Sequence, residues 1–341
     1  MKHINIPIFI PHLGCPNQCI FCNQRSISGN ESFCEENVEK EILEVLKTTN
    51  KDDACEIAFF GGSFTGIERS LMIRLLCLAQ KYVELGKVKG IRMSTRPDYI
   101  SSEIIEILKK HTISCVELGI QTINDKVLKY LKRGHTFEDT EKAIDLLNGA
   151  DLPFVGQMMI GLPGATADDE IDCATYIASK GACGSRIYPT LVLRKTELEN
   201  MTINGEYTPL SLDEAIERSA RVLKIFNDNN VPCIRIGLCD SDNLHSEESF
   251  VAGPNSPSIG EMVKSRVYYD VICKELDENS FEKAIIIYCP KGRSSQVIGN
   301  NKKNITNLKI KYGLDNIKVI EDDNLTQFNI KIRQQEEAKC V

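Results

Sequence analysis

The sequence has no apolar segment that approaches the length of a membrane span, which takes about 20 consecutive apolar residues. The apolar stretch from His3 to Pro11 is interrupted by Asn5 and by prolines, which is not the pattern of a signal peptide. Internal repeats and low-complexity tracts are also lacking. We therefore expect a cytoplasmic protein without a membrane partner.

The chain does have enough apolar residues for a large core. Hydrophobic residues make up 42% of its 341 residues, which allows a barrel-sized domain and a small second one. Its 14 cysteines are many for a cytoplasmic protein and indicate a reducing, oxygen-poor cell. Free cysteine packs as a small apolar residue, so we expect most of these side chains in the core.

Three cysteines near the N-terminus, Cys15, Cys19 and Cys22, form a Cys-x3-Cys-x2-Cys run after a strand-like segment. Three thiolates on one short loop can hold three irons of a [4Fe–4S] cluster and leave the fourth iron open, because no fourth cysteine lies nearby at ligand spacing. The alternatives are three buried free cysteines or part of a zinc site. Structural zinc takes four ligands, commonly as cysteine pairs, and no second pair is visible. The nearest other set, Cys233 and Cys239, has a five-residue gap.

Strand-like and helix-like segments alternate from the start of the chain. Apolar runs typical of strands lie at 4–10, 55–60, 90–95, 114–121, 154–160 and 184–193, with amphipathic stretches at 35–48, 68–86, 101–111, 124–131, 138–149 and 167–181. Near-continuous apolar strands are typical of parallel sheets that are covered on both faces. We therefore predict an α/β fold, a partial parallel (β/α)6 barrel over residues 1–240, with its chemistry at the carboxyl ends of the strands.

Short polar motifs follow these segments in a specific order. They are GGSFTG, STRPD, VELGIQT with KRGH, QMMIGLPG and RIYPTLVLR, after the second to the sixth strand-like segment. With the cysteine run, in which aromatic Phe21 precedes the last cysteine, the order resembles the radical S-adenosylmethionine (radical SAM) enzymes. From about residue 4 to about residue 240 the chain resembles the radical-SAM core of the Elongator catalytic subunit, a family that modifies the wobble uridine of transfer RNA. More distantly, it is similar to the oxygen-independent coproporphyrinogen dehydrogenases.

This resemblance implies cofactors, a partner and site residues. A [4Fe–4S] cluster on the three cysteines would cleave S-adenosylmethionine (SAM) to a 5′-deoxyadenosyl radical, with one electron from an external reductant of the flavodoxin or ferredoxin type. The implied SAM contacts are Phe21 near the adenine, Gly61, Gly62 and Ser63 at the amino group, Gln121 and Arg133 at the ribose and carboxylate, and Gln157 and Gly161 near the adenosyl group. The alternative for Arg133 is a solvated cation at a helix end, and for Gln121 a hydrogen bond inside the barrel.

Two departures from the Elongator pattern limit what the resemblance implies. Many relatives have Glu at the position of Ser94, so one acidic SAM contact is missing here. The sequence also shows no counterpart of the acetyltransferase domain, so carboxymethylation of uridine does not simply carry over to this chain.

The C-terminal part has a different character. Residues 241–280 are predicted to form a linker and a helix, and residues 281–335 a separate unit of strand, helix, loop, helix and strand. The chain has a net charge of −7, yet residues 289–318 carry seven basic residues and one acidic residue. The order of elements resembles a KH domain, which clamps nucleic acid on a Gly-x-x-Gly loop. The RNA-binding residues implied are Gly299, Asn300, Asn301, Lys302 and Lys303, with Lys302 in place of the second glycine.

The function predicted from these features is a radical SAM enzyme that acts on RNA, in the manner of transfer RNA modification. The KH-like unit would hold the RNA near the mouth of the barrel. Two alternatives stay open: a radical SAM enzyme that acts on a small metabolite, and a non-catalytic RNA-binding iron–sulfur protein. For the C-terminal unit itself, the alternative is a small α/β appendage with a solvated basic face.

Overall fold

The computed structural model describes residues 2–16, 19–28, 32–50, 53–238, 246 and 248–335. Cys239, of the cysteine pair considered above, lies outside these residues. The chain divides into two compact units, one made of Met1–Ser211 and Ile225–Asn255, the other of Leu212–Lys224 and Ser256–Val341. In the described ranges, no helix is both long and apolar enough to cross a membrane.

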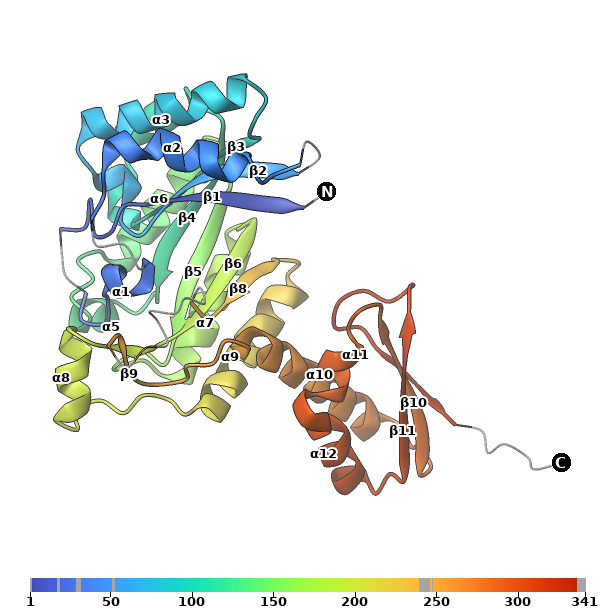
Figure 1. Ribbon diagram of the computed structural model, residues 1–341. Coiled ribbons are helices and arrows are strands. Elements are labelled where there is room, and N and C mark those ends of the chain that lie inside the picture. The colour runs from blue at the N-terminus through green and yellow to red at the C-terminus, as the bar shows by residue number, and fades with distance from the viewer. Residues whose placement is uncertain are drawn as a thin grey trace. The chain divides into compact units, whose positions relative to one another are not determined.

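The first unit is built on a seven-stranded parallel sheet, in the order β1-β2-β3-β4-β5-β6-β8 (Figure 1). The strands are β1 (His3–Phe9), β2 (Ala54–Phe60), β3 (Gly90–Thr95), β4 (Ile113–Gln121), β5 (Phe154–Ile160), β6 (Gly184–Pro189) and β8 (Cys233–Ile236). Spatial order follows chain order because helical crossovers join successive parallel strands. The predicted α/β partial barrel is confirmed, with one strand more than the six expected.

The last predicted strand, 184–193, is shorter than expected. β6 ends at Pro189, which has no N–H to continue the ladder. Val192 and Leu193 instead form β7, which pairs antiparallel with β9 (Phe250–Ala252).

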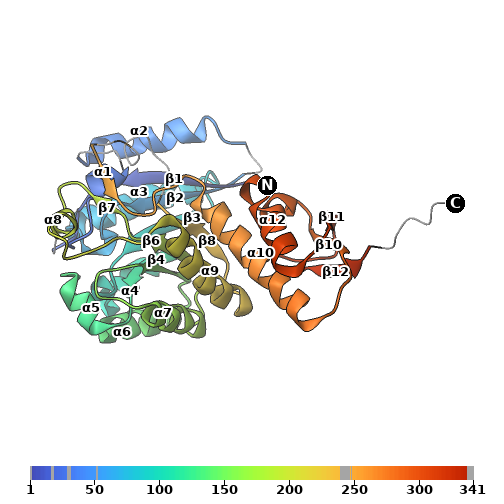
Figure 2. The same cartoon turned by 90° about the horizontal axis from the view of Figure 1, so that it is seen from below.

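Helices lie outside the strands of this unit (Figure 2). They are α1 (Gln24–Ser28), α2 (Glu35–Leu46), α3 (Arg69–Glu84), α4 (Ser102–Leu108), α5 (Asp125–Tyr130), α6 (Phe137–Asn148), α7 (Ala167–Ser179), α8 (Glu197–Ile203) and the end of α9 (Leu212–Asp228), a helix whose residues up to Lys224 belong to the second unit. Thr136 and Thr166 begin α6 and α7 with capping boxes, in which each threonine and an aspartate three residues later satisfy backbone amides. Two 3₁₀ turns, η1 (Phe64–Gly66) and η2 (Pro97–Tyr99), follow β2 and β3.

The second unit contains the C-terminal elements. They are α10 (Ile259–Glu278), β10 (Ala284–Pro290), α11 (Ser294–Ile298), η3 (Asn300–Lys302), α12 (Lys303–Tyr312), β11 (Asn316–Asp322) and β12 (Lys331–Gln334). The central strand β10 pairs parallel with β11 and antiparallel with β12. Fully buried Tyr268 of α10 packs on Phe328, with ring centroids 5.1 Å apart, and its hydroxyl accepts a hydrogen bond from the Phe328 amide. This core holds α10 against the sheet of its own unit.

Candidate active site

The cysteine loop follows β1 and is held by backbone hydrogen bonds to two other segments. The Ile20 amide donates to the Leu131 carbonyl after α5 at 3.2 Å, and the Leu198 amide in α8 donates to the Ile20 carbonyl at 2.8 Å. Within the loop, the Cys22 amide donates to the Cys19 carbonyl at 3.0 Å. These hydrogen bonds fix the backbone from Cys19 to Cys22.

The three thiols influence one another electrostatically. Burial, and after it the charge of Cys19, raises the pKa of Cys22 to about 12, and burial with a smaller effect of Cys19 also raises the pKa of Cys15. Arg133 acts in the opposite direction on both thiols. In the described part of the chain, no three ligand-type side chains already stand at metal-binding distances. Three cysteine sulfurs near a cation nevertheless form the donor set that an iron–sulfur cluster uses.

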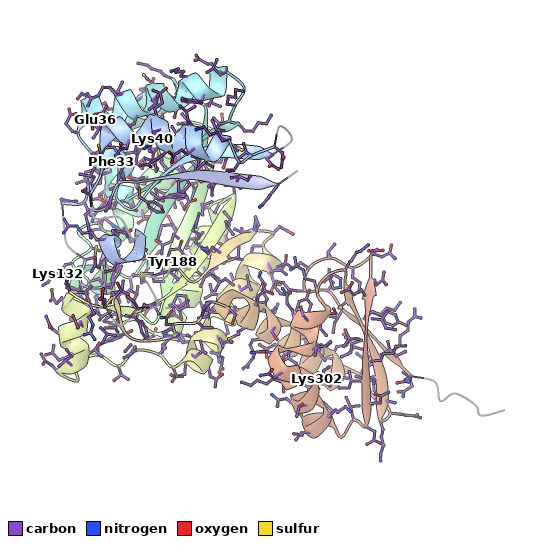
Figure 3. The ribbon with its side chains drawn as sticks, in the orientation of Figure 1. Phe33, Glu36, Lys40, Lys132, Tyr188 and Lys302 are labelled. Carbon is purple, nitrogen blue, oxygen red and sulfur yellow. The ribbon has the colours of Figure 1, made fainter. Side chains whose placement is uncertain are left out.

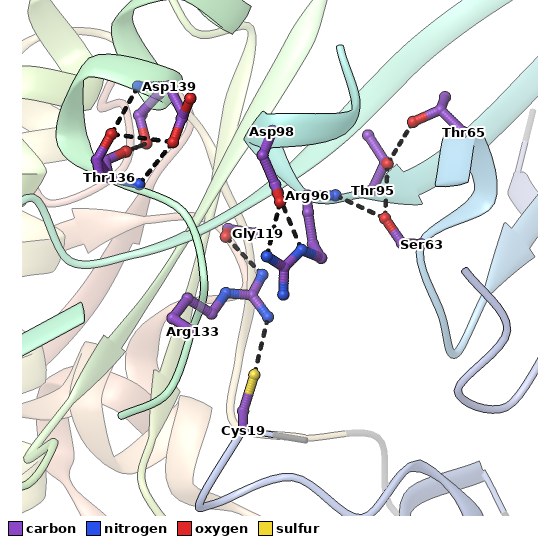
Figure 4. Close-up of polar contacts among 11 residues, drawn as sticks. Cys19, Ser63, Thr65, Thr95, Arg96, Asp98, Gly119, Arg133, Thr136 and Asp139 are labelled. Carbon is purple, nitrogen blue, oxygen red and sulfur yellow. Dashed lines mark hydrogen bonds and ion pairs between the residues drawn. The ribbon is translucent and has the colours of Figure 1, made fainter. Parts of the chain in front are cut away.

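Arg133 reaches this loop from the segment after α5 (Figure 4). It is 9% exposed; its Nη1 lies 3.5 Å from the Cys19 Sγ, and its Nη2 donates to the Gly119 carbonyl at 2.8 Å. A Cβ on Gly119 would lie 2.7 Å from this Nη2, so only glycine leaves room for the contact. The alternative of a solvated cation is therefore wrong for Arg133, and its implied contact with SAM stays a prediction.

A second guanidinium comes from the STRPD motif, for which the sequence suggested no individual role. Arg96 is 2% exposed and donates to both carboxylate oxygens of Asp98, at 2.9 and 2.8 Å. Its charge, like that of Arg133, opposes the rise in the pKa of Cys15. The motif thus brings an ion pair to the cysteine loop from the carboxyl end of β3.

The GGSFT turn after β2 packs against the segment that precedes the cysteines. The Gly61 carbonyl accepts from the His12 amide at 3.0 Å, and the Ser63 amide donates to the Leu13 carbonyl at 2.9 Å. A Cβ on Gly62 would lie 2.5 Å from the Ile10 carbonyl oxygen, a distance that backbone atoms cannot tolerate. The glycines observed here serve close approach between two backbone segments of the chain itself.

The side chain of Ser63 is already hydrogen-bonded within the chain. Its Oγ is 3.0 Å from Oγ1 of Thr95 and accepts from the Arg96 amide at 3.1 Å, and Thr95 in turn is 2.6 Å from Oγ1 of Thr65. Ser63 itself is fully buried. The contact of Ser63 with SAM stays a prediction, and it concerns the backbone of Ser63 and not its side chain.

Gln121 and Gln157, from neighbouring strands, bind each other. The Gln121 Nε2 donates to the Gln157 Oε1 at 2.8 Å, and the Gln157 Nε2 donates to the Gln121 Oε1 at 3.0 Å. Gln121 is 5% exposed and has φ of 68°, at the end of β4. Gln121 therefore makes a hydrogen bond inside the barrel, which was the alternative to a contact with SAM. The contact of Gln121 with SAM stays a prediction.

The other two implied SAM contacts also lie in this unit. The Gly161 amide donates to Glu170 at 2.6 Å, and its carbonyl accepts from the Tyr207 hydroxyl at 2.7 Å. Phe21 is partly buried and packs against an apolar cluster that includes Ile20 and Leu198. Both positions are therefore anchored by neighbouring side chains.

Buried charges cross the sheet on the face that carries Gln157. Glu117 accepts from Arg186 at 2.7 Å and from Arg92 at 3.1 Å, and Arg92 also binds Glu56 at 3.0 Å. Arg186 pairs in register with Gln157, and its Nη1 donates to the hydroxyl of Tyr188, which is labelled in Figure 3. The only trace of this network in the sequence is a set of charged residues inside apolar strands.

Two family profiles match most of the chain. The profile of the radical SAM superfamily matches residues 9–177, and that of the radical SAM C-terminal domain matches residues 183–269. The chain belongs to the radical SAM superfamily, a class of enzymes that use a [4Fe–4S] cluster and SAM. These are therefore its cofactors.

Its relatives include proteins that act on transfer RNA. An uncharacterized protein of Methanocaldococcus jannaschii is 27% identical over 63% of this chain and 69% of its own length. A tRNA uridine(34) acetyltransferase of Methanocaldococcus infernus is 33% identical over 52% of this chain and only 37% of its own length. The structure of archaeal M. infernus Elp3 superposes with a TM-score of 0.61 and 25% identity, over 81% of this chain and 63% of that one. The radical-SAM core thus resembles that of Elp3.

The candidate RNA loop lies in the second unit. Gly299 has φ of 81°, and Asn301 and Lys302 adopt left-handed conformations with φ of 50° and 61°. Buried Asn304 holds the loop, because its Nδ2 donates to the Ser265 carbonyl and hydroxyl, both at 3.0 Å. The loop borders a groove of about 910 Å³ with an amide-rich lining, which includes Asn300, Asn301, Asn304 and Asn307.

Ion pairs with acidic residues reduce the net positive charge of residues 289–318 in the folded chain. Lys303 lies 3.3 Å from Asp213, and Lys291 lies 3.4 Å from Asp323. Lys311 is likewise 3.8 Å from Asp277. Acidic residues from outside 289–318 therefore balance part of the charge, a correction that sequence distance alone could not reveal.

Proposed function

We propose that this chain is a radical SAM enzyme that modifies RNA, with transfer RNA as the first substrate to test. The observation that carries the proposal is the likeness to Elp3 over 81% of the chain. The tRNA uridine(34) acetyltransferases, of which the chain spans 37% and 27%, support the same substrate class. Such an enzyme would work in the cytoplasm.

In this proposal the first unit holds the cofactors. Cys15, Cys19 and Cys22 would bind the cluster, which would supply the electron for radical chemistry on SAM, with an external reductant of the flavodoxin or ferredoxin type as its source. The backbone of residues 61–63 and the side chains of Phe21, Gln121 and Gln157, with Gly161, would contact SAM. The tight packing of the GGSFT turn on the loop before the cysteines keeps the two binding segments in a fixed relation.

The second unit would bind the RNA backbone. Gly299 is buried against Asn304, so the exposed part of the loop is residues 300–303, in which Lys302 has no ion-pair partner among the described residues (Figure 3). The amide-rich groove beside the loop offers donors and acceptors for bases. The ion pairs of Lys291, Lys303 and Lys311 weaken this argument and favour the second candidate, a small metabolite substrate.

Binding of bulk transfer RNA at several salt concentrations tests the proposal. Phosphate contacts release counterions, so the affinity of the wild type should fall steeply with salt. Lys302→Glu combined with Lys303→Glu should weaken binding by at least about tenfold and flatten the salt dependence. The matched control, Lys291→Glu with Lys311→Glu, reverses two lysines away from the loop and should change the affinity far less.

The chemical arm uses anaerobic enzyme with SAM, a reductant and bulk transfer RNA, followed by nucleoside mass spectrometry. A new nucleoside that requires both SAM and enzyme would support the proposal. If the wild type shows no salt-sensitive affinity and forms no new nucleoside, RNA is not the substrate and the metabolite candidate replaces it.

A further inference from the structure

Arg133 is a buried cation to which the described part of the chain supplies no carboxylate. Its two terminal nitrogens contact the Gly119 carbonyl and the Cys19 sulfur, and its Nε has no hydrogen-bond partner among the described residues. Transfer of a guanidinium from water into a protein interior costs several kcal/mol unless an anion compensates it. The fold therefore leaves a positive charge that requires an anion beside Cys19.

The neighbouring charged groups do not meet this requirement. Arg96 is compensated by its two hydrogen bonds to Asp98. His135 is 3% exposed and adds no charge, because burial first, and then the charges of Arg133 and Arg96, lower its pKa to about 2. Arg133 thus provides the uncompensated cation at the cysteine loop.

We propose that Arg133 donates a hydrogen bond to the Cys19 thiolate of the bound cluster and thereby raises the reduction potential of that cluster. The inference rests on the superfamily cluster being held by the three cysteines. Reduction adds one negative charge to the cluster, so a nearby cation stabilises the reduced form more than the oxidised form. Hydrogen bonds to the sulfurs and net charge are established determinants of such potentials.

The backbone around both residues fixes their relation. The Arg133 amide donates to the Leu128 carbonyl at 3.0 Å, while the Ile20 amide donates to the Leu131 carbonyl at 3.2 Å. The arginine and the cysteine loop are therefore tied to the same segment. Gly119 completes the arrangement, because its missing side chain lets the guanidinium reach the carbonyl.

The test is a potentiometric titration of the reconstituted full-length protein, followed by electron paramagnetic resonance and performed without SAM. At the potential that half-reduces the wild-type cluster, Arg133→Met should lower the ratio of reduced to oxidised cluster by at least about tenfold, or about 59 mV for one electron. Arg133→Lys keeps the charge but loses the planar pair of donors, so its ratio should lie between the two. Gly119→Ala displaces the guanidinium without a change of charge and should shift the ratio in the same direction.

Lys132→Met is the matched control. Lys132 is the preceding residue and carries the same charge, but its side chain is 58% exposed and lies 2.5 Å from Glu197. This variant should titrate like the wild type. An equal shift in Lys132→Met and Arg133→Met would show an effect of overall charge and would overturn the proposal.

The design separates this role from SAM binding and from poor loading. The resonance signal reports only loaded molecules, so the midpoint stays measurable at partial iron content. If Arg133 acted only on the SAM carboxylate, its replacement would leave the midpoint potential of the SAM-free cluster unchanged. A wild-type midpoint potential in Arg133→Met therefore overturns the inference. If the wild type bound no cluster, the cysteine assignment would be wrong and this inference with it, whatever the outcome of the RNA experiments.

Discussion

The Nη2 of Arg186 in β6 lies 2.7 Å from the Oε1 of Glu117 in β4, across the intervening strand β5. Arg92 in β3 shares the same carboxylate oxygen. The pair of Glu117 and Arg186 connects strands that are not direct neighbours, and Arg92 extends it to the neighbouring strand β3, so these charges brace the sheet in addition to its backbone hydrogen bonds.

Arg186→Met should therefore destabilise the fold strongly. Loss of one partner leaves buried charge uncompensated, which costs about 3–5 kcal/mol. Urea unfolding of the cluster-free protein measures this free energy. Arg266→Met, which removes an arginine with a 38% exposed side chain paired with Asp270, should cost less than about 1 kcal/mol. Equal losses in the two variants would contradict a bracing role.

Cys19→Ala should remove most of the iron. Reconstituted wild type should hold about four irons per chain, and a loop with two thiols cannot retain a cluster of that type. Cys77→Ala is the control, because Cys77 is exposed and lies on α3. Iron and sulfide analysis decides the matter, and similar iron in Cys19→Ala and the wild type would refute the ligand assignment.

Gly62→Ala should lower both SAM affinity and iron content. The added Cβ would meet the Ile10 and Leu13 carbonyls, so the segment leading to the cysteines must move. Gly86→Ala is the control, since nothing lies within 4 Å of its added Cβ. There only the φ of 65° imposes a cost, of about 1–2 kcal/mol. Normal iron loading in Gly62→Ala would show that the two segments move independently.

His135 should make the cluster-free protein less stable in acid. Burial and the two arginines lower the pKa of His135 to about 2, whereas the unfolded chain takes up this proton near 6.5. Its contribution to stability is complete above pH 6.5 and declines as the pH falls, by up to about 1.4 kcal/mol per pH unit. His135→Gln lacks this proton, so its stability should depend less on pH between about 6.5 and 4.5. Parallel pH profiles for the two proteins would contradict the buried neutral histidine.

The sequence predicted the architecture because apolar periodicity and strand-end motifs are local features. The run VELGIQT identified β4, and the βα alternation gave six of the seven sheet strands. The short strand β8 lies beyond those six segments, and the end of β6 was misplaced because a proline there stops the ladder without a change in hydropathy.

Individual roles were less predictable because they depend on contacts between distant residues. Arg133 and Cys19 are 114 positions apart, and no local pattern indicates that one contacts the other. The motif STRPD was recognised, yet the pairing of Arg96 with Asp98 needed the turn η2 to be known. The pairing of Lys303 with Asp213, 90 positions away, was equally invisible, so the basic excess of the C-terminal segment was overestimated.

The amide pair of Gln121 and Gln157 has a consequence for the conditions under which the site keeps its shape. Neither side chain can ionise, and each satisfies the other at 2.8 and 3.0 Å. Screening by salt and changes of pH, which weaken the charged contacts around them, leave a neutral amide pair almost unaffected. The ends of β4 and β5 should therefore stay in register across a wide range of cellular ionic conditions, and a change in activity with pH or salt must originate elsewhere in the molecule.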